Sequence, residues 1–131
     1  IAMLSYSNFG SSSHPMANKV ENAVKFLRRS NPNLIVDGPI QSDFALNKLM
    51  LTNKFEESKL GNQKVNILVF PNLDSANITY KVIKEIDGAK SIGPIIMGLD
   101  KAVHILQLKP SVEEIVNMSA IAVIDAQSRN E

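Results

Sequence analysis

The chain has 131 residues, a length that suits one ordinary domain with its own hydrophobic core. Its lack of cysteine, its two histidines and its formal net charge of +1 exclude disulfides, a cysteine nucleophile and a zinc cluster, and predict no strong attraction to nucleic acid or anionic membranes. No apolar stretch approaches the roughly 20 residues of a membrane helix, and no secretory signal opens the chain, so we expect a cytoplasmic protein.

Five short apolar runs, rich in branched side chains, have the length of β-strands. They cover residues 1–4, 34–36, 65–70, 95–97 and 103–106. Because each run is continuous, the strands suit a parallel sheet that is covered on both faces. The first run begins at Ile1 without a polar lead-in, so we expect the chain to be a fragment of a longer protein.

Helical patterns separate these runs in the first half of the chain. Apolar side chains recur at helical spacing over residues 16–27, and Pro15 is tolerated in the first turn of that helix. A shorter apolar helix is predicted over residues 44–51, with Ser42 and Asp43 as capping residues.

Two further helices are predicted in the second half. The first covers residues 78–86 and ends at Gly88, which suits a left-handed C-cap. Ser111 and Glu114 form a capping box at the start of the second. Residues 115–126 of that helix are apolar on nearly every side, which is typical of a helix buried in a fold or against another subunit, so we expect an interface there.

The alternation of strands and helices predicts a single α/β unit over residues 1–131, with a mostly parallel sheet of about five strands and helices on both faces. In such sheets ligands bind beyond the carboxyl ends of the strands, and here those segments are polar or glycine-rich. They contain Ser5, Ser7, Asn8, Gly10, Ser11, Ser12, Ser13, Asp37, Gly38, Pro71, Asn72, Asp74 and Gly98.

Each of these signals has a structural alternative. Residues 10–13 precede a helix and suit a phosphate site, but a cap and turn explains them as well. Asp37 and Asp43 are either a paired acid and base or, as we favour, a strand end and a helix cap. His14 and His104 are each more typical of a hydrogen-bonded structural residue than of a catalyst. The chain has no nucleophile elbow, Walker loop or dinucleotide fingerprint.

Five segments in order resemble successive signatures of the phosphate acetyltransferases, or phosphotransacetylases. They read LSYSNFGSS, VDGPIQSDFAL, NILVFPNLDSANITYK, IGPIIMGLDKAVHIL and SVEEIVNMSAIAVIDAQ, and cover nearly the whole chain. The resemblance implies the C-terminal lobe of a fold like that of the isocitrate and isopropylmalate dehydrogenases. It also implies a family that moves an acetyl group between phosphate and coenzyme A without a metal.

The resemblance fails where the family carries a motif like Asn-Asp-Leu-Ser-Arg-Gly, whose serine and arginine serve the acyl phosphate. Gln107 stands in place of the serine and Leu108 in place of the arginine. An aliphatic side chain cannot supply the two charged hydrogen bonds of a guanidinium, and Lys109, one position away, is only a flexible point charge. Glu114 matches a family acid that assists the thiol, although its capping box explains it without catalysis. We therefore expect no catalytic residue.

A similar departure marks the phosphotransacetylase-like domain at the C-terminus of bacterial NADP-dependent malic enzymes, which residues 101–106 and 115–118 resemble. That resemblance implies a regulatory and oligomerisation domain that binds acetyl-coenzyme A without turnover. The parent chain would convert malate to pyruvate, with NADP and a divalent metal in the absent domain. The expected acetyl-coenzyme A site comprises Ser5, Ser7, Gly10, Ser11, Ser12, Asn72, Asp74, Gly98 and Lys109.

Two alternatives remain open at this point. The first is an active phosphate acetyltransferase whose site is rebuilt around Lys109 and groups on the absent lobe. The second is a purely structural domain that holds subunits together through residues 115–126. In all cases we expect self-association into at least a dimer, and neither a nucleic acid nor a membrane as partner.

Overall fold

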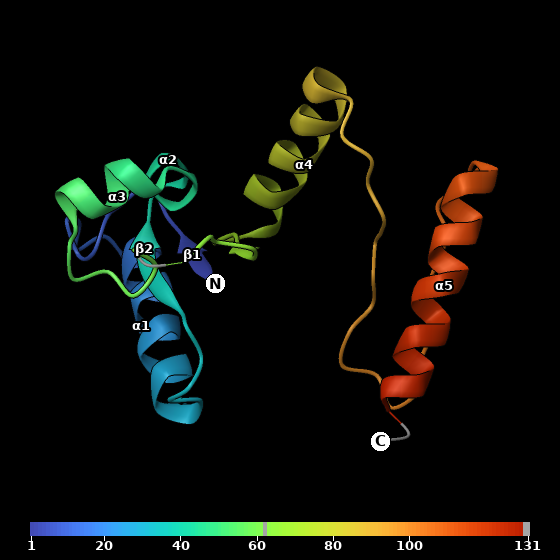
Figure 1. Ribbon diagram of the computed structural model, residues 1–131, viewed down its shortest axis with the longest axis horizontal. Helices are drawn as coiled ribbons and strands as arrows, with labels where there is room; N and C mark the ends of the chain where they lie inside the picture. Colours follow the sequence, from blue (N-terminus) through green and yellow to red (C-terminus); the bar gives the residue numbers. More distant parts are fainter. Residues whose placement is uncertain (62, 130–131) are drawn as a thin grey trace. The chain divides into compact units, whose positions relative to one another are not determined.

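The computed structural model describes residues 1–61 and 63–129 (Figure 1). The chain divides into two compact units, the N-terminal unit Ile1–Lys81 and the C-terminal unit Val82–Glu131. In chain order the elements are β1 (Ala2–Leu4), α1 (Pro15–Ser30), β2 (Asp37–Ile40), α2 (Ser42–Leu46), α3 (Lys48–Lys54), β3 (Leu68–Val69), α4 (Leu73–Asp87) and α5 (Val112–Ser128).

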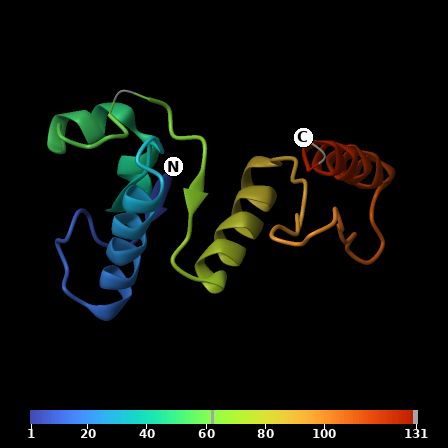
Figure 2. The same ribbon diagram turned by 90° about the horizontal axis from the view of Figure 1, so that it is seen from below.

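The N-terminal unit contains a parallel sheet with the strand order β2-β1-β3. Successive side chains of a strand point to opposite faces, and β1 follows this rule. Ala2 and Leu4 pack in one apolar cluster with residues of α2 and α3, while Met3 packs in a second cluster with residues of α1. Helices therefore cover both faces, α1 one and α2 with α3 the other, as predicted (Figures 1 and 2).

The second predicted strand is shifted along the chain. It was expected over residues 34–36, whereas β2 begins at Asp37 and includes Gly38. The buried Asp37 carboxylate is tolerated inside the strand because hydrogen bonds satisfy it. Gly38 is required, since its φ is +139° and an added Cβ would lie 2.4 Å from the carbonyl oxygen of Met3.

Two of the five predicted strands are wrong. Across the described part of the C-terminal unit, residues 95–97 and 103–106 belong to no strand. A β-strand exists only where a neighbour accepts its hydrogen bonds, and the sheet here contains β1, β2 and β3 alone among the described residues. Apolar composition alone does not provide that neighbour.

The predicted helix over residues 44–51 is two short helices, α2 and α3. Ser42 and Asp43 are the first residues of α2 and not its caps. The helix is interrupted at Asn47, because the Asn47 side chain accepts a hydrogen bond from the Met50 N–H and so caps α3.

The ends of the longer helices agree with the sequence. Pro15 occupies the first turn of α1, and the Met16 N–H donates to Nδ1 of His14, the N-cap. Gly88 follows α4 with a φ of +60°. The capping box of Ser111 and Glu114 opens α5.

The apolar side chains of α5 are mostly exposed within this chain. Met118 is the one apolar side chain that is buried among the described residues of the C-terminal unit. Val112, Val116, Val123 and Ile124 on the same helix are exposed. No helix in the described part of the chain combines the length and the apolar character of a membrane span.

Candidate functional site

A cavity of about 420 Å³ lies at the carboxyl ends of β1 and β3. The chain leaves β1 through α1 to reach β2 on one side, and then reaches β3 on the other side of β1. The strand order therefore reverses between β1 and β3, and open parallel sheets bind ligands at such a topological switch point. We call this cavity the switch-point pocket.

The lining of the switch-point pocket divides into an apolar and a polar part. Its apolar residues are Leu4, Met16, Phe70 and Pro71. Its polar residues are Ser5, Tyr6, Ser42, Asn72 and Ser75. None of these lining residues carries a charge.

Two of the predicted ligand-binding residues, Ser5 and Asn72, meet in this pocket. Asn72 also caps α4, since its Oδ1 accepts the Ser75 N–H at 2.8 Å and its carbonyl oxygen accepts the Ser75 hydroxyl at 3.1 Å. Asp74 lies in the exposed first turn of α4 and does not line the pocket.

The predicted serines of the loop after β1 serve the shape of the loop itself. Ser7 is buried, and its Oγ lies 2.9 Å from Oγ of Ser11, which also accepts the Asn8 N–H at 3.0 Å. Ser12 Oγ lies 3.1 Å from the hydroxyl of Tyr6. Gly10, at the tip, has a φ of +83°. The pocket lining includes neither Ser7, Gly10, Ser11 nor Ser12.

Gln41 fastens this loop to the end of β2. Its backbone N–H donates to Oδ1 of Asn8 at 2.8 Å, while Nδ2 of Asn8 donates to its side-chain oxygen at 2.9 Å. Nε2 of Gln41 donates to the Tyr6 carbonyl at 2.6 Å. The ring of Phe9 packs edge-on against Phe55, with the two centroids 4.8 Å apart. The loop that carries Ser5 and Tyr6 into the pocket lining is therefore held by Gln41 through hydrogen bonds and by Phe55 through ring packing.

Sequence reasoning missed most of the pocket. Met16 and Ser42 come from the starts of α1 and α2, and only the tertiary fold places them beside the strand ends. Lys19, one turn after Met16, donates from Nζ to the Pro71 carbonyl at 2.9 Å and so joins α1 to the turn after β3. The strand-end rule had already identified Pro71, but no short sequence pattern points to Met16 or Ser42.

Asp37 and Asp43 do not form an acid–base pair in this geometry. The Asp37 carboxylate pairs with Arg28 and accepts hydrogen bonds from the Gly38 N–H, the Ser58 hydroxyl and the Lys59 N–H at 2.8 to 2.9 Å. Its acceptor capacity is used by the fold. Asp43 is exposed in the first turn of α2, where its Oδ1 accepts the Phe44 N–H at 2.9 Å. Both residues have structural roles, but not the ones we expected, because Asp37 opens β2 and Gln41, not Asp43, is the N-cap of α2.

In the C-terminal unit, Gln107 and Glu114 line a common cavity of about 20 Å³ together with Met118. That volume holds about one water molecule and no larger ligand. The Leu108 side chain lies outside it and is 98% exposed. Gly98 and Lys109 have φ values of +85° and +57° and do not line it.

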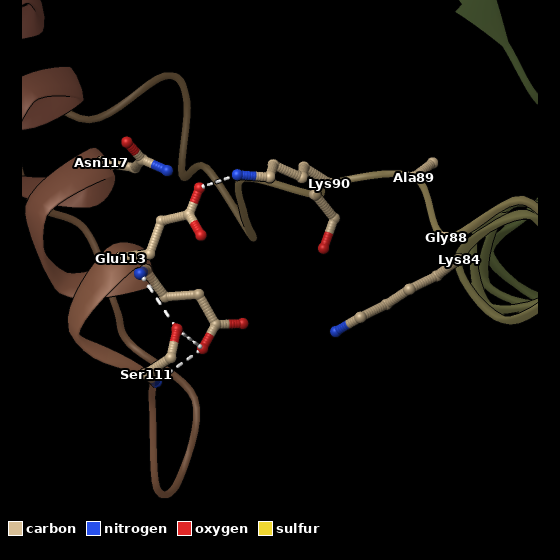
Figure 3. A pocket seen from close by; sticks show the side chains of 9 residues that line it. Lys84, Gly88, Ala89, Lys90, Ser111, Glu113 and Asn117 are labelled. Atoms are coloured by element: carbon tan, nitrogen blue, oxygen red, sulfur yellow. Dashed lines mark hydrogen bonds and ion pairs between the residues drawn. The ribbon is translucent and has the colours of Figure 1, made fainter.

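A larger cavity of about 250 Å³ lies at the start of α5 (Figure 3). Glu114 accepts hydrogen bonds there from the N–H and hydroxyl of Ser111, at 2.7 and 3.0 Å. These bonds lower the pKa of Glu114, and the charge of Lys84 adds to the effect. Lys90 forms an ion pair with Glu113 at 2.5 Å, and Lys84 reaches toward the same cavity. The cavity thus holds two carboxylates and two ammonium groups.

His104 belongs to a charged cluster on the side of α5. Its Nε2 lies 3.1 Å from Oδ2 of Asp125, and its Nδ1 is buried without a hydrogen-bond partner. Arg129 donates to Asp125 at 2.8 Å, and this bond is the main cause that lowers the pKa of Asp125. The structural role that we expected for His104 agrees with this geometry. The described residues contain no group of three or more metal-ligating side chains that could hold a metal ion.

Comparison with known proteins supplies the family. The model of the phosphate acetyl/butaryl transferase family matches residues 1–123. The chain is 38% identical over 130 residues to the NADP-dependent malic enzyme of Escherichia coli and 40% identical over 127 residues to the phosphate acetyltransferase of Clostridium acetobutylicum. The first alignment covers 98% of this chain but 17% of the malic enzyme. The second covers 97% of this chain but 38% of the acetyltransferase.

Solved structures agree with this result. A phosphotransacetylase from Streptococcus pyogenes superimposes with a TM-score of 0.87 at 35% identity, over 99% of this chain and 39% of that one. The predicted α/β fold with a parallel sheet is thereby confirmed, although the sheet has fewer strands than expected. The chain belongs to the phosphate acetyl/butaryl transferase family.

Proposed function

We propose that this chain is a regulatory and oligomerisation domain of an NADP-dependent malic enzyme and binds acetyl-coenzyme A without converting it. The parent chain would convert malate to pyruvate, with NADP and a divalent metal held outside these residues. One observation carries the proposal: the exposed aliphatic side chain of Leu108, at the position where the phosphate acetyltransferase resemblance calls for an arginine. Similarity to malic enzymes over nearly the whole chain supports it.

The state of Glu114 supports the absence of turnover. A general base for a thiol should have a pKa near the working pH, whereas the bonds from Ser111 lower the pKa of this carboxyl. Loss of one charged group that stabilises a transition state typically costs about 10²–10³ in rate. With no guanidinium at position 108 and a weakened base at position 114, the chain retains binding more readily than catalysis.

Two measurements on the full-length protein test this function. Calorimetry should detect acetyl-coenzyme A binding, and acetyl phosphate mixed with coenzyme A should give no enzymatic formation of acetyl-coenzyme A. The double replacement Gln107→Ser with Leu108→Arg should raise acetyl transfer above that background. Met97→Arg, which adds the same charge at another exposed position, should not. Absence of acetyl-coenzyme A binding would refute the regulatory role.

A second candidate, an active phosphate acetyltransferase, is favoured by the position of Lys84. Its ammonium group lies close enough to Glu114 to lower the pKa of that carboxyl, and in this candidate it takes the place of the missing arginine. The 40% identity to a phosphate acetyltransferase also supports this candidate. It requires enzymatic turnover by the unmodified protein and its loss in Lys84→Met, with Lys81→Met on the same helix as the control.

The oligomerisation half of the proposal rests on the exposed apolar side chains of α5. Contiguous exposed apolar surface typically marks a contact with another protein. Val116→Asp, at an exposed position of α5, should therefore dissociate the full-length oligomer in analytical ultracentrifugation, while Gln127→Asp on the same helix should not. Should Val116→Asp dissociate the oligomer of a protein that has no acetyl-coenzyme A response, the domain is purely structural.

A further inference from the structure

We propose that the switch-point pocket takes the uncharged, amide-bearing arm of a coenzyme A thioester and leaves the phosphates of that ligand outside. The inference rests on the proposed function, because it assigns a subsite to the ligand proposed there. It concerns the pocket between β1 and β3, which the N-terminal unit forms by itself.

The lining of the pocket does not suit a phosphate. Phosphate sites use cations or several free N–H groups, because an anion loses much hydration energy on burial. The pocket lining contains no charged side chain. The ligand would instead contact the apolar side chains of the lining, which are those of Leu4, Met16, Phe70 and Pro71.

The helix starts beside the pocket do not supply the missing donors. The Met16 N–H at the start of α1 already donates to Nδ1 of His14 at 3.3 Å. The Ser75 N–H at the start of α4 already donates to Oδ1 of Asn72 at 2.8 Å, and the Ser75 hydroxyl donates to the Asn72 carbonyl. The Met16 amide and the amide and hydroxyl of Ser75 are thus engaged within the protein and are not free to bind an anion.

A neutral chain of methylene and amide groups fits the same lining well. The volume of about 420 Å³ lies in the range of small-molecule pockets, roughly 300–1,000 Å³. The methylene groups would contact the apolar wall. The hydroxyls of Ser5, Tyr6 and Ser42 both donate and accept hydrogen bonds, so they suit the N–H and C=O groups of amides.

Lys19 supplies positive charge next to the pocket but outside its lining. It is exposed, lies one turn after Met16, and donates to the Pro71 carbonyl with one of its three hydrogens. Its charge would attract the phosphates of the nucleotide end, while the thioester arm enters between β1 and β3.

The experiment measures ligand binding to the full-length protein labelled with ¹³C at methionine methyl groups. Pantetheine should shift the Met16 methyl resonance and compete with acetyl-coenzyme A, while inorganic phosphate should leave that resonance unchanged. Met16→Lys should weaken pantetheine binding about tenfold or more, because it places a charge against the neutral arm, whereas Met16→Leu should weaken it less than about threefold. A pocket that binds phosphate would give the opposite order, with tighter phosphate binding in Met16→Lys.

Lys19→Gln separates the two ends of the ligand. It should weaken acetyl-coenzyme A binding several-fold and leave pantetheine binding unchanged. Failure of pantetheine to shift Met16 would overturn this inference even if acetyl-coenzyme A binds elsewhere. Failure of acetyl-coenzyme A to bind at all would instead overturn the proposed function, and pantetheine would still report on the pocket.

Discussion

The two units of the chain are stabilised in different ways. In the N-terminal unit, buried apolar side chains form two clusters, one on each face of the sheet. In the described part of the C-terminal unit, Met118 is the one buried apolar side chain, while polar contacts join the loops to α5. The hydrophobic effect therefore stabilises the first unit within this chain, whereas the contacts of the second are mainly polar, and exposed ion pairs such as Lys90–Glu113 add little stability.

This difference bears on function. The N-terminal unit can hold a pocket of fixed shape because its strand ends are anchored to a packed core. Most apolar side chains of α5 are exposed in this chain, so their burial against another surface would still lower the free energy. A contact with another protein surface would use them, which agrees with the proposed role of this helix in oligomerisation.

The largest expected effect comes from comparing a buried apolar residue of the N-terminal unit with an exposed apolar residue of α5. Leu51 is 1% exposed, so Leu51→Ala should lower the free energy of unfolding of the N-terminal unit by about 3 kcal/mol through lost burial and a cavity. Val123 on α5 is 56% exposed, and Val123→Ala should change stability by less than about 0.5 kcal/mol. Urea unfolding of this chain measures both. Equal losses would contradict the division into a packed and an uncovered unit.

The next effect concerns the buried carboxylate of Asp37. Asp37→Asn removes the charge that Arg28 pairs with, and we expect a loss of about 2 kcal/mol, less than for a fully buried pair because the Arg28 side chain is 36% exposed. Asp43→Asn, at an exposed site on α2, should stay within about 0.5 kcal/mol. Urea unfolding again provides the measurement. A similar loss in both variants would show that Asp37 has no special role in the core.

Sequence patterns predicted the fold where a local rule decides the outcome. The cap of α5 at Ser111 and the end of α4 at Gly88 depend on residues within one turn, so the sequence alone contains the cause. The position of β2 was missed because the burial of Asp37 depends on Arg28 and Ser58, which are distant in sequence. The charged Asp37 side chain can be buried in β2 only because the folded chain brings Arg28 and Ser58 next to its carboxylate.

The candidate site shows the same limit. Ser5 and Asn72 follow strands directly, so the strand-end rule identified them. Met16 and Ser42 reach the pocket only through the packing of helices on the sheet, for which no short motif exists. The serines of the loop after β1 were predicted as ligand-binding residues, but the structure shows Ser7 and Ser11 hydrogen-bonded to each other.

A smaller effect is expected at the start of α5. Ser111→Ala removes the side chain that accepts the Glu114 N–H, and loss of such a cap typically costs about 1 kcal/mol. Hydrogen exchange of amides in the first turn of α5 should therefore become faster. Ser119→Ala is the control, because the Ser119 hydroxyl only donates back to the Ile115 carbonyl within the helix. Unchanged exchange in Ser111→Ala would mean that other contacts hold this end of the helix.

The smallest effect should appear only in acid and only in the C-terminal unit. Arg129, and after it His104, lowers the pKa of Asp125 below its ordinary value of 3.8. A carboxyl whose pKa is lower in the folded state stabilises that state above its ordinary pKa, and this contribution is lost as the pH falls from there through the lowered value. Protection of α5 amides, corrected for the intrinsic pH dependence of exchange, should therefore decline over that range. Asp125→Asn should flatten the decline, and an identical decline in the variant would mean that another group causes it. Because the N-terminal unit keeps its packed core, the amides of β1 should stay protected while those of α5 begin to exchange.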